Sequence, residues 1–195
     1  MPPHDPRAEV DLCARLHRGD EAAFGTLYRR HRDAIYRFAL LYCGNPAHAA
    51  DVTQDTFVHL ITQPTQYDPA RGSVGAWLCG VARNLARRQA GVREDAVDPA
   101  DLADDTGLPE AYVDRDTPLE RIVRNESAEE VRRAVAALAP HYRDVLILCE
   151  LSDLSYAEAA HVCGIDIGTV RSRLSRARAR LAQHLAPPAR AKEAM

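Results

Sequence analysis

Residues 152–185 read SDLSYAEAAHVCGIDIGTVRSRLSRARARLAQHL, and this stretch decides the expected fold of the C-terminal part. Ser155 and Glu158 have the spacing of a capping box, in which each side chain satisfies a backbone N–H at the start of a helix. Gly164 suits the end of that helix. Asp166 suits the start of a second helix, because an acid there caps the backbone and favours the helix dipole. The stretch therefore predicts a helix-turn-helix.

The second of these helices is expected to have two different faces. At about 100° per residue, one narrow arc is apolar and contains Ile167, Val170, Leu174, Ala177, Leu181 and Leu185. The opposite face carries Thr169, Ser172, Ser175, Arg176 and Ala179, flanked by Arg173 and Arg180 on one side and by Arg171 and Arg178 on the other. Small polar residues suit base edges and flanking arginines suit phosphates, so the pattern favours a helix in the DNA major groove. The alternative is a surface helix with a solvated basic face.

Composition predicts an all-α protein. Hydrophobic residues make up 46% and charged residues 27% of the 195 residues, and no strand-like alternation stands out. Apolar residues at helical spacing extend over 8–91, which we interpret as an N-terminal domain. Within it we expect helices at 47–62 and at 74–89, the latter capped by Ser73.

The stretch 92–125 differs from the rest of the chain. It holds ten acidic and four basic residues, three prolines and no sustained apolar face. That composition is typical of a flexible linker. Helical periodicity returns afterwards, so 126–186 is expected to be the second domain. The expected fold is two small helical domains joined by a flexible acidic linker.

Two N-terminal helices carry polar patterns that each allow two interpretations. The 74–89 helix turns Trp77 inward and presents Arg83, Asn84, Arg87 and Arg88 on its other face. Arginine and asparagine suit a nucleic-acid strand, but the same residues would also serve as a solubilising face. In the 47–62 helix, the carboxylates of Asp51 and Asp55 share a face with Gln54, which fits either a basic partner or the helix dipole.

Four stretches together carry a family resemblance. They are 50–57 (ADVTQDTF), 74–86 (VGAWLCGVARNLA), 154–160 (LSYAEAA) and 168–178 (GTVRSRLSRAR). In order and spacing they resemble the extracytoplasmic-function (ECF) group of bacterial sigma factors in the sigma-70 family. The resemblance covers about residues 8 to 186.

This resemblance implies partners and site residues. The N-terminal domain would bind core RNA polymerase, at the β′ clamp, through Asp51, Gln54, Asp55 and Phe57. It would also capture the melted −10 element of promoter DNA through Trp77, Arg83, Asn84, Arg87 and Arg88. The C-terminal domain would contact the β flap and read the −35 element as duplex through Thr169, Arg171, Ser172, Arg173, Ser175 and Arg176. The family commonly has an anti-sigma partner, so one is expected here.

Other features limit the function classes. The sequence has no P-loop, G-x-S-x-G or H-E-x-x-H motif, so we expect a transcription initiation factor and no enzyme. No apolar run is long enough for a bilayer and no secretory start is present, which favours a cytoplasmic protein. The five cysteines are scattered, so reduced, packed thiols are expected, with no cofactor and no metal.

Two rival hypotheses remain. A stand-alone helix-turn-helix regulator would explain 119–186 but leaves the N-terminal patterns without a role. An enzyme or metal-binding helical protein would use the scattered Cys and His residues, among them Cys43 and His48, which are near each other in sequence.

Overall fold

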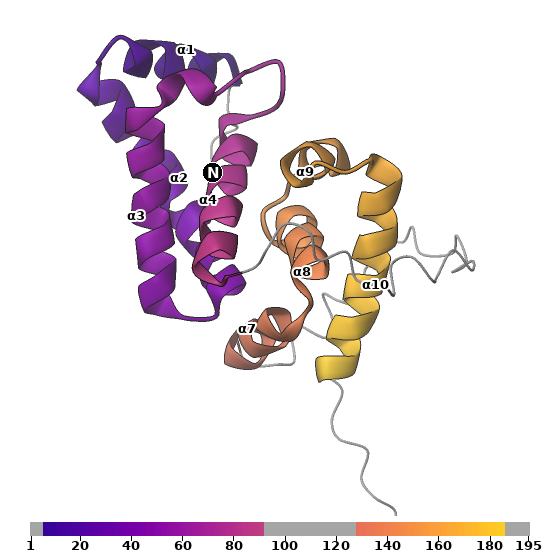
Figure 1. Cartoon of the computed structure of the whole chain (residues 1–195). Coiled ribbons are helices and arrows are strands. Elements are labelled where there is room, and N and C mark those ends of the chain that lie inside the picture. Colours follow the sequence, from indigo (N-terminus) through magenta and orange to yellow (C-terminus); the bar gives the residue numbers. More distant parts are fainter. Residues whose placement is uncertain (1–5, 92–127, 186–195) are drawn as a thin grey trace, which may run out of the picture.

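The computed structural model of the chain describes residues 6–91 and 128–185. Over these ranges the chain is helical and contains no strand, so the expected all-α fold is confirmed (Figure 1). The expected linker, 92–125, lies outside the described residues. The domain boundaries drawn from the sequence therefore stay a prediction.

The N-terminal helices pack around one long helix. They are α1 (Pro6–His17), α2 (Glu21–Cys43), α3 (Pro46–Thr62), the 3₁₀ turn η1 (Pro64–Gln66) and α4 (Val74–Gln89). α2 contacts α1, α3 and α4, and it buries Leu27, Ile35 and Phe38. The helices expected from the sequence at α3 and α4 are confirmed, as is the Ser73 cap, whose Oγ accepts the Ala76 N–H at 3.2 Å.

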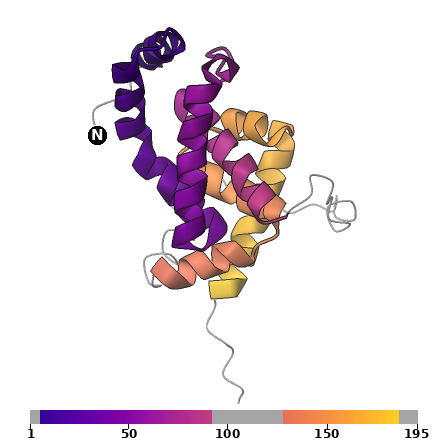
Figure 2. The same ribbon diagram turned by 60° about the vertical axis from the view of Figure 1, so that its left-hand side comes forward.

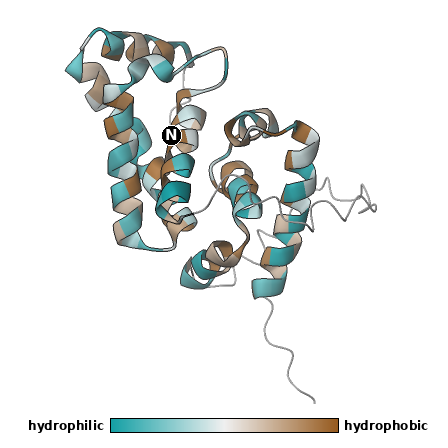
Figure 3. Cartoon of the chain, viewed as in Figure 1, coloured by the Kyte–Doolittle hydropathy of each residue, from teal (hydrophilic) through white to brown (hydrophobic). Residues whose placement is uncertain are grey.

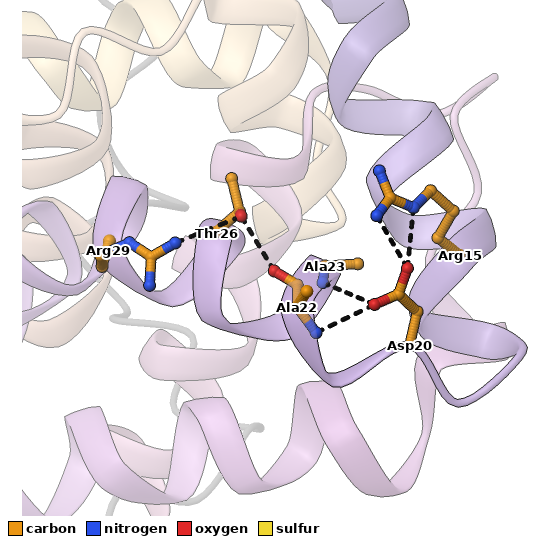
Figure 4. Close-up of polar contacts among 6 residues, drawn as sticks. All are labelled: Arg15, Asp20, Ala22, Ala23, Thr26 and Arg29. Carbon is orange, nitrogen blue, oxygen red and sulfur yellow. Dashed lines mark hydrogen bonds and ion pairs between the residues drawn. The ribbon is translucent and has the colours of Figure 1, made fainter.

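Asp20 fixes the corner between α1 and α2 (Figure 4). Its carboxylate accepts hydrogen bonds from the backbone N–H groups of Ala22 and Ala23, at 2.9 and 3.2 Å. The same carboxylate pairs with the Arg15 guanidinium of α1 at 2.8 Å. These bonds, the one from Arg15 foremost, hold the pKa of Asp20 below its ordinary value. One side chain thus caps α2 and ties it to α1.

The turn between α2 and α3 is built from three successive residues. Gly44 has a φ of 68°, a left-handed conformation that glycine adopts without steric cost. The Asn45 side chain accepts the Ala47 N–H at 2.8 Å. Pro46 occupies the first helical position, where no N–H is needed. The chain therefore reverses its direction within a short turn, and α3 packs along α2.

The C-terminal helices form a second group. They are α7 (Ala128–Ala137), α8 (Pro140–Leu146), the π-helical turn η2 (Ile147–Leu151), α9 (Tyr156–Cys163) and α10 (Ile167–Leu185). α10 packs on α7, α8 and α9. The apolar run 145–148 joins α8 to η2 and lies entirely inside the protein.

The two groups of helices pack against each other. α4 lies against α9, and α2 lies against α7 and η2 (Figures 1 and 2). Arg143 of α8 donates hydrogen bonds to the carbonyls of Tyr42 at 3.2 Å and of Leu138 at 2.9 Å, which links the ends of α2 and α7. Hydrophobic and hydrophilic residues alternate around the helices (Figure 3), as expected for amphipathic helices that share a core.

Candidate nucleic-acid interface

The helix-turn-helix expected from the sequence is present as α9 and α10. Ser155 Oγ accepts the Glu158 N–H at 3.2 Å, and the Glu158 carboxylate accepts the Ser155 N–H at 3.1 Å, which completes the capping box. Gly164 ends α9 with a φ of 68°. Local sequence alone therefore sets the start and the end of the first helix.

Asp166 starts α10 as expected, and it engages one of the residues assigned to DNA. Its two carboxylate oxygens accept the backbone N–H of Thr169 at 2.8 Å and the Thr169 hydroxyl at 2.6 Å. These bonds lower the pKa of Asp166. The Ser172 hydroxyl donates to the Thr169 carbonyl at 3.1 Å. Thr169 thus serves the helix cap, whereas Arg171 and Ser172 stay exposed.

The two faces of α10 follow the helical wheel. The apolar arc is buried at Val170, Leu174, Ala177 and Leu181. The two ends of the arc differ: Leu185, the last residue of the helix, is half-buried, and Ile167, the first, is 42% exposed because it lies at the edge of the packed face. On the other side, Arg173, Ser175 and Arg176 are half-buried.

Two arginines of α10 that were expected to flank DNA are bound within the protein. Arg178 forms an ion pair with Glu150 of η2. The Arg180 guanidinium lies over the Tyr142 ring, 4.6 Å from its centroid. Both contacts hold α10 onto the preceding helices, so the first role of Arg178 and Arg180 is structural.

A cavity of about 760 Å³ lies along α4 and brings several of the predicted −10 residues together. Trp77, Asn84, Arg87 and Arg88 line it. The rings of His59 and Tyr67 lie 6.0 and 5.9 Å from the Trp77 ring. These two aromatic neighbours were missed from the sequence, because they come from α3 and the following loop.

Arg83 and Arg87 are bound to an acid that sequence analysis also missed. The Asp144 carboxylate of α8 accepts both guanidinium groups on one oxygen, Arg83 at 2.7 Å and Arg87 at 2.9 Å. Asp144 is 2% exposed, and the two arginine side chains are 12% and 13% exposed. Burial by itself lowers the pKa of Arg83, but the charge and hydrogen bond of Asp144 raise it on balance. The signal for Asp144 in the sequence is its position, directly before the apolar run 145–148.

The expected polymerase-binding residues divide between surface and core. Asp51, Gln54 and Asp55 are exposed on α3. Phe57 is 3% exposed and packs edge-on against the Tyr28 ring at 4.8 Å, so it supports the helix from inside. The exposed face of α3 continues instead through two apolar residues, Val58 and Ile61, which are 48% and 49% exposed. Their spacing of seven and ten residues from Asp51 is the signal that would have found them.

Burial disfavours the thiolate form of the cysteines. Burial raises the pKa of four thiols, to about 11 for Cys13 and Cys163 and to about 12 for Cys79 and Cys149. Burial raises the pKa of Cys43 as well. All five are free thiols. Within 6–91 and 128–185, no group of three or more His, Cys, Asp or Glu side chains is arranged to hold a metal ion.

Among the helices that the structure describes, none has the length and hydrophobicity needed to span a membrane.

Comparison with protein families identifies two regions. Residues 27–93 match sigma-70 region 2, and residues 128–181 match sigma-70 region 4. α4 lies in the first match, and the helix-turn-helix begins in the second.

Curated relatives are similar over most of this chain. The ECF RNA polymerase sigma factor SigC of Mycobacterium tuberculosis is 32% identical over 175 residues, which cover 89% of each chain. The ECF RNA polymerase sigma factor SigE of Mycolicibacterium smegmatis is 33% identical over 179 residues, which cover 86% of this chain and 65% of that relative.

Solved structures share the arrangement of helices. CnrH in complex with the cytosolic domain of CnrY is 29% identical, with a TM-score of 0.66 over 91% of this chain and 97% of that one. The sigma factor RpoE in complex with the anti-sigma factor NepR from Bartonella quintana is 27% identical, with a TM-score of 0.61 over 83% of this chain and 96% of that one.

Proposed function

The chain belongs to the ECF sigma factors of the sigma-70 family, and on this basis we propose that it directs core RNA polymerase to a specific set of promoters. One observation carries the proposal. A region 2 match and a region 4 match follow each other in one chain, and each contains an arginine-rich helix, α4 in the first and α10 in the second. A stand-alone regulator has no need of the first region.

The C-terminal helices are the reader of the −35 duplex in this proposal. α10 follows a capped α9, as a recognition helix does, and it exposes Arg171 and Ser172 near its start. Ser175 and Arg176 follow about one turn later on the same face, and Arg173 flanks it. The N-terminal half of a recognition helix is the part that reaches base edges in the major groove.

The N-terminal helices are the reader of the melted −10 strand. Asn84 and Arg88 are exposed and line the cavity along α4, and Trp77, which also lines it, lies near the rings of His59 and Tyr67. Extruding a base costs a few kcal/mol of stacking, which contacts in a pocket must offset. An asparagine beside aromatic rings offers paired hydrogen bonds and a stacking surface for this purpose.

The partners in this proposal are core RNA polymerase, promoter DNA and an anti-sigma protein. The exposed face of α3 combines acids with Val58 and Ile61, a combination that suits a partner with basic and apolar groups, here the β′ clamp. The C-terminal helices would meet the β flap. An anti-sigma partner is supported by RpoE, which was solved with the anti-sigma factor NepR.

The protein would act by binding alone. Nucleotide addition belongs to the polymerase, so the chain is no enzyme in this proposal, and it acts in the cytoplasm where the polymerase works. It is expected to need no cofactor of its own.

The test is transcription in a reconstituted system. Core RNA polymerase of the source organism is mixed with the purified chain and a library of promoter fragments from that genome. We expect the chain to co-purify with the core enzyme and to produce transcripts with defined starts that the core enzyme alone does not make. Unchanged start sites, or sequence-specific duplex binding that never involves polymerase, would contradict the proposal and favour a stand-alone regulator.

A further inference from the structure

The face of α10 that the proposed function assigns to duplex DNA begins with three polar residues that bond to one another. The carboxylate of Asp166 accepts the Thr169 hydroxyl at 2.6 Å and the Thr169 backbone N–H at 2.8 Å. The Ser172 hydroxyl donates to the Thr169 carbonyl at 3.1 Å. Both hydroxyl hydrogens therefore already have an acceptor inside the protein.

The bond between the side chains of Asp166 and Thr169 goes beyond what the start of a helix needs. The backbone bond alone caps the helix, and an uncharged serine or asparagine in place of Asp166 would accept it about as well. A Cβ added at Gly168 would lie 2.9 Å from the Asp166 carboxylate, so a larger residue there would displace the carboxylate. The glycine thus fits the position that this charged group occupies.

The hydrogen-bonding capacity that remains at this end of α10 is that of an acceptor. An ionised carboxylate has about four sites for hydrogen bonds, and a hydroxyl that donates still has oxygen lone pairs. Hydrogen bonds from the Thr169 hydroxyl and backbone lower the pKa of Asp166, so its carboxylate stays charged near neutral pH. Residues 167–185 contain no acid, so Asp166 brings the one carboxylate to this stretch of the sequence.

A donor follows further along the same face. Thr169, Ser172 and Arg176 are spaced three and four residues apart, which places them on one side of the helix, away from the buried Val170 and Leu174. At a rise of about 1.5 Å per residue, the seven-residue step from Thr169 to Arg176 spans about 10 Å, or about three base-pair steps. Along the helix, the face therefore changes from acceptors to a guanidinium donor.

The four bases differ in what they present to such acceptors in the major groove. Adenine and cytosine expose an amino group, N6 or N4, which donates a hydrogen bond. Guanine and thymine expose a carbonyl oxygen, O6 or O4, which accepts one. A carboxylate opposite a carbonyl oxygen leaves both groups without a donor, and an unpaired buried acceptor costs more free energy than a typical hydrogen bond contributes.

We propose that Asp166, Thr169 and Ser172 select an amino base, adenine or cytosine, at one position of the bound duplex and reject guanine and thymine there. The inference rests on the proposed function, because that function assigns α10 to the −35 duplex. It adds Asp166 to the residues that read DNA, and it gives a chemical class to the base that the start of α10 reads.

The experiment selects duplexes from a random library. The full-length chain binds the library together with core RNA polymerase in one arm and alone in the other, and the recovered duplexes are sequenced. We expect one position at which adenine and cytosine exceed guanine and thymine by about fivefold or more, the lower end of what a wrong base pair costs. In Asp166→Asn, whose amide can also donate, this preference should fall below about twofold while the other positions keep theirs.

Asp153→Asn is the matched control. It makes the same change of net charge at an exposed residue in the turn before α9. Asp153 has a φ of 56°, a conformation that asparagine also adopts, so the variant is expected to fold. We expect it to leave every base preference unchanged.

Two results would overturn the inference. One is the absence of a position that prefers amino bases in both arms. The other is a rise in the affinity of Asp166→Asn for all sequences with unchanged preferences, which would show that Asp166 only repels phosphates. If Asp166→Asn does not fold, Thr169→Val, which keeps the shape and removes the hydroxyl, should weaken the same preference, and an unchanged preference in that variant would also overturn the inference.

The outcome is separable from that of the proposed function. The selected duplexes are also tested as templates for transcription by core polymerase with the unmodified chain. Transcription without a preference for amino bases rejects only the inference. A preference that the chain alone shows, without any transcription, rejects the proposed function and assigns the same reading to a stand-alone regulator.

Discussion

At the residue scale, the arginines of this protein divide according to whether an acceptor from another helix reaches them. Arg83 and Arg87 meet Asp144, and Arg178 meets Glu150. Arg171 and Arg88 are exposed. All of them look alike in sequence, as basic residues on the polar side of an amphipathic helix. Their first energetic role is decided by the helix that faces them.

Arg176 provides a test of base reading by α10. We expect Arg176→Ala to cost about 1–3 kcal/mol in −35 recognition if the guanidinium binds a guanine edge with two hydrogen bonds. The measurement is holoenzyme affinity for a promoter and for the same promoter with a substituted −35 base. An equal loss of affinity for both promoters would show that Arg176 contacts a phosphate and not a base.

Arg178 is the matched control for that test. Because Arg178 pairs with Glu150, Arg178→Ala is expected to lower the free energy of unfolding by about 1 kcal/mol and to leave discrimination between the two promoters unchanged. Urea denaturation measures the first effect. A change in discrimination with unchanged stability would contradict the structural role of this residue.

Asn84 tests the base pocket beside α4. Asn84→Ala is expected to reduce the yield of open complexes several-fold while changing duplex binding little, because the side chain would meet a base only after melting. Permanganate footprinting of the −10 region measures opening. Gln89→Ala, at the exposed end of the same helix, is the control. An unchanged open-complex yield would show that Asn84 does not contact the base.

At the element scale, helix boundaries are set by short polar contacts close in sequence. Asn45, Ser73 and Ser155 each accept a backbone N–H at the start of a helix, and Asp166 does so at α10. Such caps are each worth about 0.5–2 kcal/mol, which is enough to fix where a helix begins. Asp20 does this and also contacts the preceding helix.

Asp20 predicts a pH dependence of stability. Its pKa is lowered in the folded protein, so its charged form stabilises the fold above the ordinary pKa, and this contribution is lost as pH falls through the folded pKa. Asp20→Asn keeps a capping oxygen and removes the carboxylate charge that pairs with Arg15. The stability difference between the two proteins, from urea denaturation, is expected to shrink between about pH 6 and about pH 3. A constant difference over this range would exclude the Arg15 pair as its source.

At the scale of the whole molecule, the packing of α4 on α8 and α9 couples the two ends of the protein. Under the proposed function, region 2 and region 4 reach two separate promoter elements, whereas in this structure they share an interface that includes the buried Asp144. If the two regions separate on polymerase, as the proposed function requires, that binding has to replace these contacts with others of similar strength.

This requirement predicts a change in distance. Dyes placed by cysteine-independent labelling at Arg37 of α2 and Gln183 of α10, both exposed, should show high energy transfer in the free chain. We expect the transfer efficiency to fall when core polymerase is added, and to start lower in Asp144→Asn. Equal efficiency with and without polymerase would show that the closed arrangement persists in the holoenzyme.

The sequence by itself determined the features that depend on neighbours along the chain. The helix-turn-helix, its capping box, the cap at Ser73 and the apolar arc of α10 were all predicted, because a hydrogen bond or a helical face needs only residues within a few positions. The family followed from the order of four such local stretches. The expectation that Ile167 packs with the apolar arc was wrong, because a residue at the end of a helix can have the right periodicity and still lie outside the packed face.

Only the tertiary structure decided which polar groups meet across the protein. The pairing of Asp144 with Arg83 and Arg87, the contact of Glu158 with Ser73, and the aromatic rings around Trp77 join residues from different helices. The burial of Phe57 also depends on another helix, because α2 places Tyr28 against its ring. Periodicity shows that a side chain lies on a given face of its helix. It contains no information about which acid or ring the opposing helix places there.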